Sequence, residues 1–124
     1  MIILLAATSF SCENAQEKVF DKLNEEVMSL HDQIMPKTED LVTLKSQLDS
    51  LSKGPDSTHV KQLQSALSKA DNSMMDWMHH YSLDSLEKMS LKDKIDYLTL
   101  QINQLHAIDK LTDSTLTAAK NYVQ

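Results

Sequence analysis

The chain is poor in the residues that end helices or shape special loops. Its 124 residues include one glycine and two prolines, far below the usual shares of about 7% and 5%. So few turn-forming residues allow only a small number of reversals, and they exclude the glycine-rich loops that cradle phosphate groups. We therefore expect long elements with short connections, in one domain, because the chain is too short for two cores.

Arginine is absent, so all 12 basic residues are lysine. Arginine is the residue that proteins mainly use for bidentate recognition of phosphate and carboxylate groups. The net charge is −6, and the sequence contains no basic patch. A chain of this charge repels nucleic acids, so we expect no binding to DNA or RNA.

Catalytic motifs are missing as well. The chain has no CxxC and no HExxH motif, and its single cysteine cannot form an internal disulfide. Serine, histidine and aspartate are plentiful, but they fall on the faces of expected helices without a nucleophile elbow. The sequence therefore predicts a protein that is not an enzyme.

The N-terminal segment predicts a lipoprotein signal peptide. Residues 2–7 form an apolar run that is too short to cross a bilayer, which needs about 20 residues. Small and polar residues follow, then Cys12, and the chain becomes charged directly after it. This junction resembles the lipobox of bacterial lipoproteins, where the cysteine is lipidated and the chain is cut before it. We interpret residues 1–11 as the signal peptide, residues 12–124 as the mature domain, and Cys12 as the anchor.

The junction departs from a strict lipobox in two respects. Ser9 and Phe10 replace the usual aliphatic and small residues, and no basic residue precedes the apolar run. The missing positive charge indicates that the true start lies upstream, so we expect the signal peptide to be truncated here. The alternative is an ordinary N-terminal segment with a free thiol.

Apolar residues after this segment recur at spacings of three and four, which is typical of helices that pack along a seam. In the expected first helix, residues 15–53, the seam keeps its phase across Pro36. A kinked but continuous helix explains this better than a loop, which has no reason to keep phase. The seam consists of Phe20, Leu23, Val27, Leu30, Ile34, Leu41, Leu44, Leu48 and Leu51.

The first reversal is expected at Gly54 and Pro55. Glycine at the helix end, with Asp56 or Ser57 as a cap, favours a second helix over residues 57–81. Its seam consists of Val60, Leu63, Leu67, Ala70, Met74, Trp77 and Tyr81.

The third helix is expected over residues 90–122. A connector at residues 82–89 contains cap-like residues, and Ser90 with Asp93 forms a capping box. The seam of this helix consists of Leu91, Ile95, Leu98, Ile102 and Leu105 and then shifts phase through Ile108, Leu111, Leu116 and Ala119.

Three amphipathic helices with short connections cover each other's seams by running up, down and up. The predicted fold class is all-α: an elongated, antiparallel, coiled-coil-like three-helix bundle with a kink at Pro36. With the second reversal near residues 85–86, His106 is expected level with Leu44, and His59 lies near the opposite end.

Methionine and histidine gather where the first two helices face each other. Met28, His31 and Met35 share one face because they are three and four residues apart. The reversal at Gly54 places Met35 opposite Met74 and His31 opposite Met78. Thioether and imidazole ligands suit Cu(I) and can also ligate haem. The candidate metal ligands are Met28, His31, Met35, Met78 and His79.

Two other interpretations of the cluster need no metal. Methionine is a common filler of helical cores, and histidines near a helix C-terminus interact favourably with the helix dipole. The cluster could instead form a surface for a partner, and Met75 and His80 are its candidate residues.

Three segments are similar to one group of proteins. They are residues 27–37 (VMSLHDQIMPK), residues 70–81 with the block MMDWMH, and Tyr97–Leu98. Together they resemble small Bacteroidota lipoproteins that often carry the label "viral A-type inclusion protein". The resemblance covers nearly the whole mature chain. It implies an envelope location and coiled-coil-like helices, but no particular activity.

The sequence therefore predicts a lipid-anchored, non-enzymatic helical protein of the cell envelope, at the outer membrane or facing the periplasm. We expect it to meet the membrane through Cys12 and to act structurally or through an unknown protein partner, without a cofactor. The alternative is an envelope protein that binds copper, as Cu(I), or haem at the Met/His cluster.

Overall fold

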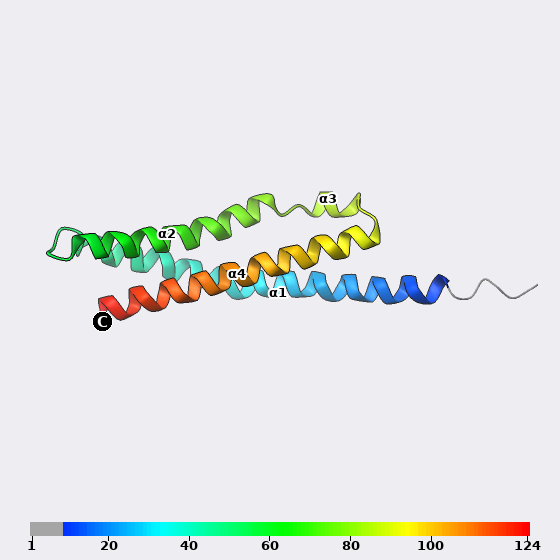
Figure 1. Cartoon of the computed structure of the whole chain (residues 1–124), viewed down its shortest axis with the longest axis horizontal. Coiled ribbons are helices and arrows are strands. Elements are labelled where there is room, and N and C mark those ends of the chain that lie inside the picture. The colour runs from blue at the N-terminus through cyan, green and yellow to red at the C-terminus, as the bar shows by residue number, and fades with distance from the viewer. Residues whose placement is uncertain (1–8) are drawn as a thin grey trace, which may run out of the picture.

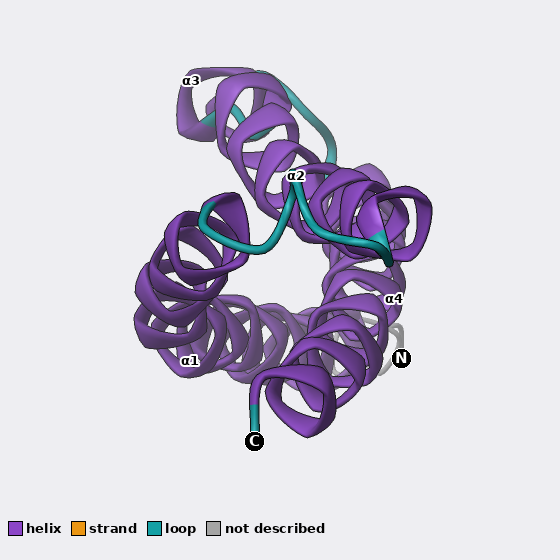
Figure 2. Cartoon of the chain, turned by 90° about the vertical axis from the view of Figure 1, so that its left-hand side faces the viewer, coloured by secondary structure: helices purple, strands orange, loops and turns teal. Residues whose placement is uncertain are grey.

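The computed structural model describes residues 9–124, which form helices and no strand. The helices are α1 (Ser9–Asp49), α2 (Ser57–His80), α3 (Leu83–Glu87) and α4 (Leu91–Val123). Figures 1 and 2 show α1, α2 and α4 side by side in an elongated bundle, with α2 antiparallel to the other two. The expected all-α three-helix bundle is confirmed. Residues 1–8 of the expected signal peptide lie outside the described residues.

α1 passes through Pro36 without interruption, as the phase of its seam predicts. Proline removes one backbone hydrogen bond of the helix, and this loosens the helix locally. The hydroxyl of Thr38 donates to the carbonyl of Met35 at 2.6 Å in the same turn. Figure 1 shows the axis of α1 changing direction near its middle. None of the helices in residues 9–124 has an apolar stretch long enough to cross a membrane.

The first reversal lies where the sequence places it, but its details differ. α1 ends at Asp49, four residues before the expected end, and backbone bonds between residues three apart form the turn that follows. Gly54 does not take a left-handed conformation. Asp56 makes no capping hydrogen bond to α2. Its carboxylate instead accepts a hydrogen bond from the hydroxyl of Tyr122 at 3.1 Å, which ties the turn to α4.

The second reversal lies later in the chain than expected, because α3 continues in the direction of α2 before the chain turns back (Figure 1). The backbone N–H of Ser82 donates to the hydroxyl of Tyr97 at 3.3 Å. Ser82 and Tyr97 lie about equally far from Met89 along the chain, and so do Asp56 and Tyr122, which are in contact at the other end. The reversal is therefore centred near Met89 and not near residues 85–86. The relative register of α4 and α1 shifts accordingly.

Serine caps begin both helices after this connection. The hydroxyl of Ser82 accepts from the backbone N–H of Ser85 at 3.2 Å at the start of α3. The hydroxyl of Ser90 accepts from the N–H of Asp93 at 3.2 Å at the start of α4. Both bonds satisfy N–H groups that a helix start otherwise leaves without partners. The expected cap at Ser90 is confirmed.

The buried apolar residues form two clusters, one toward each end of the bundle. The cluster nearer the N-terminus of α1, here called the proximal core, contains Val27, Leu30, Ile34, Met74, Trp77, Leu86, Leu98, Ile102 and Leu105. The other cluster, the distal core, contains Leu41, Leu44, Leu48, Val60, Leu63, Leu67, Ala70, Leu116 and Ala119.

The seam of α4 does not shift phase between the two cores. Leu98, Leu105, Thr112 and Ala119 follow at seven-residue steps, and all four are buried. The expected shift through Ile108 and Leu111 is therefore wrong. Thr112 is the polar residue in this row. The seven-residue spacing of the seam is therefore kept, and only the residue type changes from apolar to polar.

Candidate functional site

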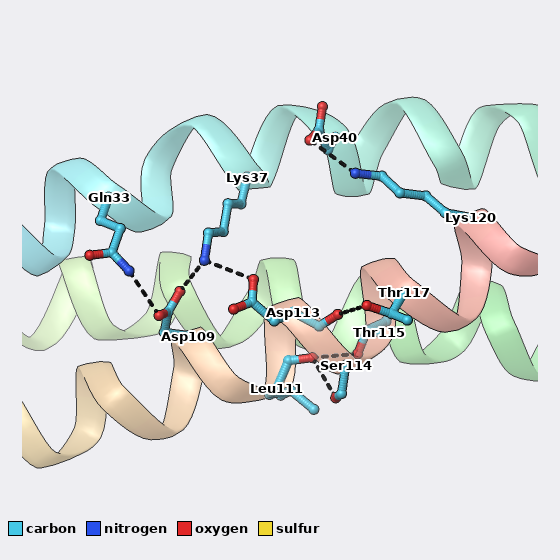
Figure 3. Close-up of polar contacts among 10 residues, drawn as sticks. All are labelled: Gln33, Lys37, Asp40, Asp109, Leu111, Asp113, Ser114, Thr115, Thr117 and Lys120. Carbon is cyan, nitrogen blue, oxygen red and sulfur yellow. Dashed lines mark hydrogen bonds and ion pairs between the residues drawn. The ribbon is translucent and has the colours of Figure 1, made fainter.

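Polar side chains separate the two cores, and Figure 3 shows their contacts. The ammonium group of Lys37 on α1 donates to the carboxylates of Asp109 and Asp113 on α4, each at 2.7 Å. Gln33 donates to the second oxygen of Asp109 at 3.1 Å. The layer also includes the buried Thr112. We call Gln33, Lys37, Asp109, Thr112 and Asp113 the polar layer.

Lys37 and Asp109 occupy seam positions that elsewhere hold apolar residues. Their side chains are only 25% and 16% exposed. Burial by itself would lower the pKa of Lys37, but the hydrogen bonds to both carboxylates and their charges outweigh it and raise the pKa above its usual 10.5. The polar layer therefore holds a charged lysine, and it favours the one register of α1 and α4 that pairs it.

The candidate residues of α1 form a row along its flank toward α2. Met28, Met35 and Val42 are seven residues apart, so they lie on one line along the helix. Met35 packs against the proximal core, while Met28 is 45% and Val42 58% exposed. The sequence interpretation missed Val42, although the spacing from Met28 and Met35 would have found it.

α2 supplies the other side of this surface. Val42 lines a pocket of about 200 Å³ with Ser68 and Asp71 of α2. Met75 and Met78 follow those two residues by seven positions, so they extend the same side of α2. Both are half-buried, and Met78 packs against the proximal core. We call the surface formed by Met28, Met35, Val42, Met75 and Met78 the methionine face.

Carboxylates line the methionine face. Glu25, Asp32 and Glu39 are exposed, and each precedes a residue of the row on α1 by three positions. Asp71 adds a half-buried carboxylate on the α2 side, and Lys45 lies beside it at the pocket. The apolar face is therefore bordered by negative charge along its length.

The two histidines expected as metal ligands, His31 and His79, differ in their exposure and in their contacts. His31 is half-buried, its ring centroid is 6.3 Å from that of Trp77, and its Nδ1 lies 3.0 Å from the carboxylate of Asp32. His79 is exposed. Among the described residues, no three His, Cys, Asp or Glu side chains are grouped as a metal site. Ligation by methionine sulfur stays a prediction.

Two other histidines differ from what the sequence suggests. His80 lines a groove between α2 and α4, so it does not share a surface with Met75. The Nε2 of His106 lies 3.8 Å from the carboxylate of Glu26. His106 is therefore level with the start of the methionine face, not with Leu44, because the second reversal is centred near Met89 rather than near residues 85–86. It faces the α1–α4 side, so it still lies outside the cluster.

His59 lies at the opposite end of the bundle, as expected, where its ring meets that of Tyr122 with centroids 5.2 Å apart.

Comparison of the chain with known protein families, with curated proteins and with solved structures found no match. The proposed function is therefore inferred from the residues of this chain and their geometry.

Proposed function

We propose that this chain is a lipid-anchored helical protein of the cell envelope that binds a protein partner and catalyses no reaction. Cys12, the expected anchor, is an exposed residue of α1. All side chains from Cys12 to Val19 are exposed, so this part of the helix is a spacer of about 12 Å before the bundle begins. Such a spacer suits a bundle that is held just above a lipid surface.

Replacing the cysteine tests the anchor. Two or three acyl chains attached at Cys12 make membrane association stable, because each buried methylene contributes about 0.8 kcal/mol. We expect Cys12→Ser to release the protein into the soluble fraction or to leave an uncut precursor, while Asn14→Ala behaves like the parent. If Cys12→Ser matures normally and fractionates with membranes, the protein is not anchored through this residue.

The methionine face supports the proposal that this chain binds a protein partner. Exposed Met28 and Val42 share one line along α1 with the half-buried Met35, next to a pocket and to the half-buried Met75 and Met78 of α2. Apolar side chains on the outside of a small bundle are normally scattered, so this grouping is unusual. Methionine side chains adapt to partners of different shape, so they recur on helix-binding surfaces. The pocket beside Val42 has room for one anchoring apolar side chain.

The partner that fits this face is a basic amphipathic helix. An apolar row at seven-residue spacing accepts a helix with the same spacing. The carboxylates at Glu25, Asp32 and Glu39 attract lysine or arginine on that helix. A second copy of this chain, docked symmetrically by the same face, would place these carboxylates against each other, which disfavours a homodimer.

Charge reversal tests the partner. Affinity purification of the anchored protein from cells, with quantitative mass spectrometry, should enrich an envelope protein that has a basic amphipathic segment. We expect Glu25→Lys/Asp32→Lys/Glu39→Lys to remove that protein. The control Asp21→Lys/Asp84→Lys/Glu87→Lys changes the charge equally at exposed sites away from the face and should retain it. Equal recovery with all three proteins would contradict the proposed site.

A further inference from the structure

A groove of about 560 Å³ runs between α2 and α4 beside the proximal core. It lies on the flank of α2 opposite the methionine face, so it is independent of the proposed partner site. Trp77 and Tyr97 contribute aromatic surface to it, and Ala107 and Ile108 contribute apolar surface. A volume of this size accommodates a small organic molecule.

The groove offers a carboxylate and two side-chain amides as hydrogen-bonding groups. Asp76 contributes the carboxylate, and the amides of Gln101 and Gln104 each contribute one acceptor oxygen beside an NH2 donor. The Nδ1 of His80 lies 2.7 Å from the backbone oxygen of Asp76. If Nδ1 carries the proton, the other ring nitrogen can accept. No lysine lines the groove among the described residues, so it offers no permanent positive charge to an anion.

Gln101 points to a ligand. Its side chain is only 7% exposed, yet it makes no hydrogen bond to any residue that the structure describes. Buried amides without partners are rare in folded proteins, because each lost hydrogen bond costs free energy. Its amide is not among the polar atoms sealed from solvent, and the residue lines the groove. The amide is therefore accessible from the groove, where a ligand can bind it.

We propose that this groove binds a small organic ammonium ion, such as a short alkyl diamine. An ammonium group has three donors and no acceptor, so it matches a lining of carboxylate and amide oxygens. Tyr81 stacks on the rings of Trp77 and Tyr97, with centroids 4.9 and 6.1 Å apart. The methylenes of the ligand therefore pack on the parts of these rings that line the groove and on Ile108. The amide oxygen of Gln101 and the carboxylate of Asp76 hold the ammonium ends. The net charge of −6 favours cations over anions at the entrance.

Trp77 is the only tryptophan in the chain, so its fluorescence reports on the groove directly. The full mature domain is titrated with putrescine, with the neutral analogue butanediol and with the anion succinate. We expect a saturable change with putrescine and none with the other two. A change with butanediol of similar affinity, or no saturable change with putrescine, would overturn the proposal.

Variants separate the groove from general attraction to an acidic surface. We expect Gln101→Leu and Asp76→Asn each to weaken putrescine binding about ten-fold, because each removes a hydrogen bond to a charged group. Asp84→Asn removes the same charge at an exposed site outside the groove and should leave the affinity unchanged. Circular dichroism checks that each variant is folded, and Asp76 is exposed, so its replacement leaves the core intact. Equal binding by all variants would show only non-specific attraction and would contradict the assignment.

Discussion

The proximal and distal cores are built from the same three helices but from different side chains. The buried residues of the distal core are all leucine, valine or alanine. The proximal core contains Met74 and Trp77, with Met35, Met78 and Tyr81 packed against it. The groove at Gln101 adjoins the proximal core, and so do Met35 and Met78 of the methionine face. The pocket at Val42 is instead lined by Leu41 and Leu67 of the distal core.

The difference in composition indicates that the two cores have different roles in the bundle. An aliphatic core packs uniformly and holds helices in register. Two polar atoms in and around the proximal core are buried without a hydrogen-bond partner, the indole nitrogen of Trp77 and the hydroxyl of Tyr81. The third such atom among the described residues, the hydroxyl oxygen of Thr112, lies in the polar layer. Such atoms reduce stability, and they collect where a protein binds other molecules. We infer that the distal core contributes more to stability, and that the recognition surfaces lie over the proximal core and at its border with the distal core.

The largest predicted effect is a truncation in the distal core. Leu67 is 1% exposed, so Leu67→Ala should lower the free energy of unfolding by about 2–5 kcal/mol through the cavity it leaves. The comparison variant Met35→Leu in the proximal half keeps side-chain volume and should cost less than about 1.5 kcal/mol. Urea unfolding followed by circular dichroism measures both. Similar losses for the two variants would break the proposed distinction between the halves.

The polar layer between the cores predicts a smaller effect. Lys37→Leu leaves Asp109 with Gln33 as its one remaining partner in the layer, and we expect a loss of about 1–3 kcal/mol. The double variant Lys37→Leu/Asp109→Leu should recover most of it, because the mostly buried carboxylate of Asp109 is then removed, while Asp113, 57% exposed, is solvated without Lys37. As a control, Lys92→Leu breaks an exposed pair with Asp96 and should change stability by less than about 1 kcal/mol. If the double variant is weaker than the single one, the layer contributes more than charge pairing.

The polar layer also predicts a loss of stability at alkaline pH. The pKa of Lys37 is raised in the folded protein, and burial likewise raises the pKa of Tyr81. A raised pKa gives stability that is fully present below the value of the unfolded chain and is lost as pH rises through the folded value. We expect the free energy of unfolding to fall above the usual lysine value of 10.5. Lys37→Leu should reduce the slope of the free energy of unfolding against pH in this range. An unchanged slope would show that other groups cause the loss of stability at alkaline pH.

The smallest effect is expected from methionine exchange. Leucine is close to methionine in volume, so Met28→Leu/Met35→Leu/Met78→Leu should keep its helical content and lose less than about 1.5 kcal/mol. We expect neither this variant nor the parent to take up Cu(I) in competition with a chelator. Saturable one-to-one uptake by the parent alone would instead establish the copper site with His31 and His79.

The periodic parts of the fold could be predicted because their signals are local. The seam through Pro36, the reversal at Gly54 and the cap at Ser90 follow from spacing and from the preferences of single residues. The polar layer could not be predicted in the same way. Asp109 and Lys37 resemble solvated residues in the sequence, and only their seam positions show that they face each other.

The candidate site also depends on local spacing, and its function stays a prediction. Met28, Met35 and Met78 share both residue type and spacing, whereas Val42 shares only the spacing. His106 is at a different level from the one expected, because α3 continues the path of α2 and so moves the reversal toward the C-terminus. Errors in one connection shift every residue that follows it, while residues within one helix keep their spacing.

We propose that the methionine face binds a basic amphipathic helix, and site-specific photo-crosslinking in cells detects such a contact without purification of the complex. A photoreactive residue is placed at Val42, and for comparison at Leu100, which is 53% exposed on α4. We predict that Val42 yields one dominant adduct, mapped by mass spectrometry to a partner segment with lysine or arginine beside apolar residues at helical spacing, and that Leu100 yields none. Absence of an adduct at Val42, or the same adduct from both positions, would contradict the claim.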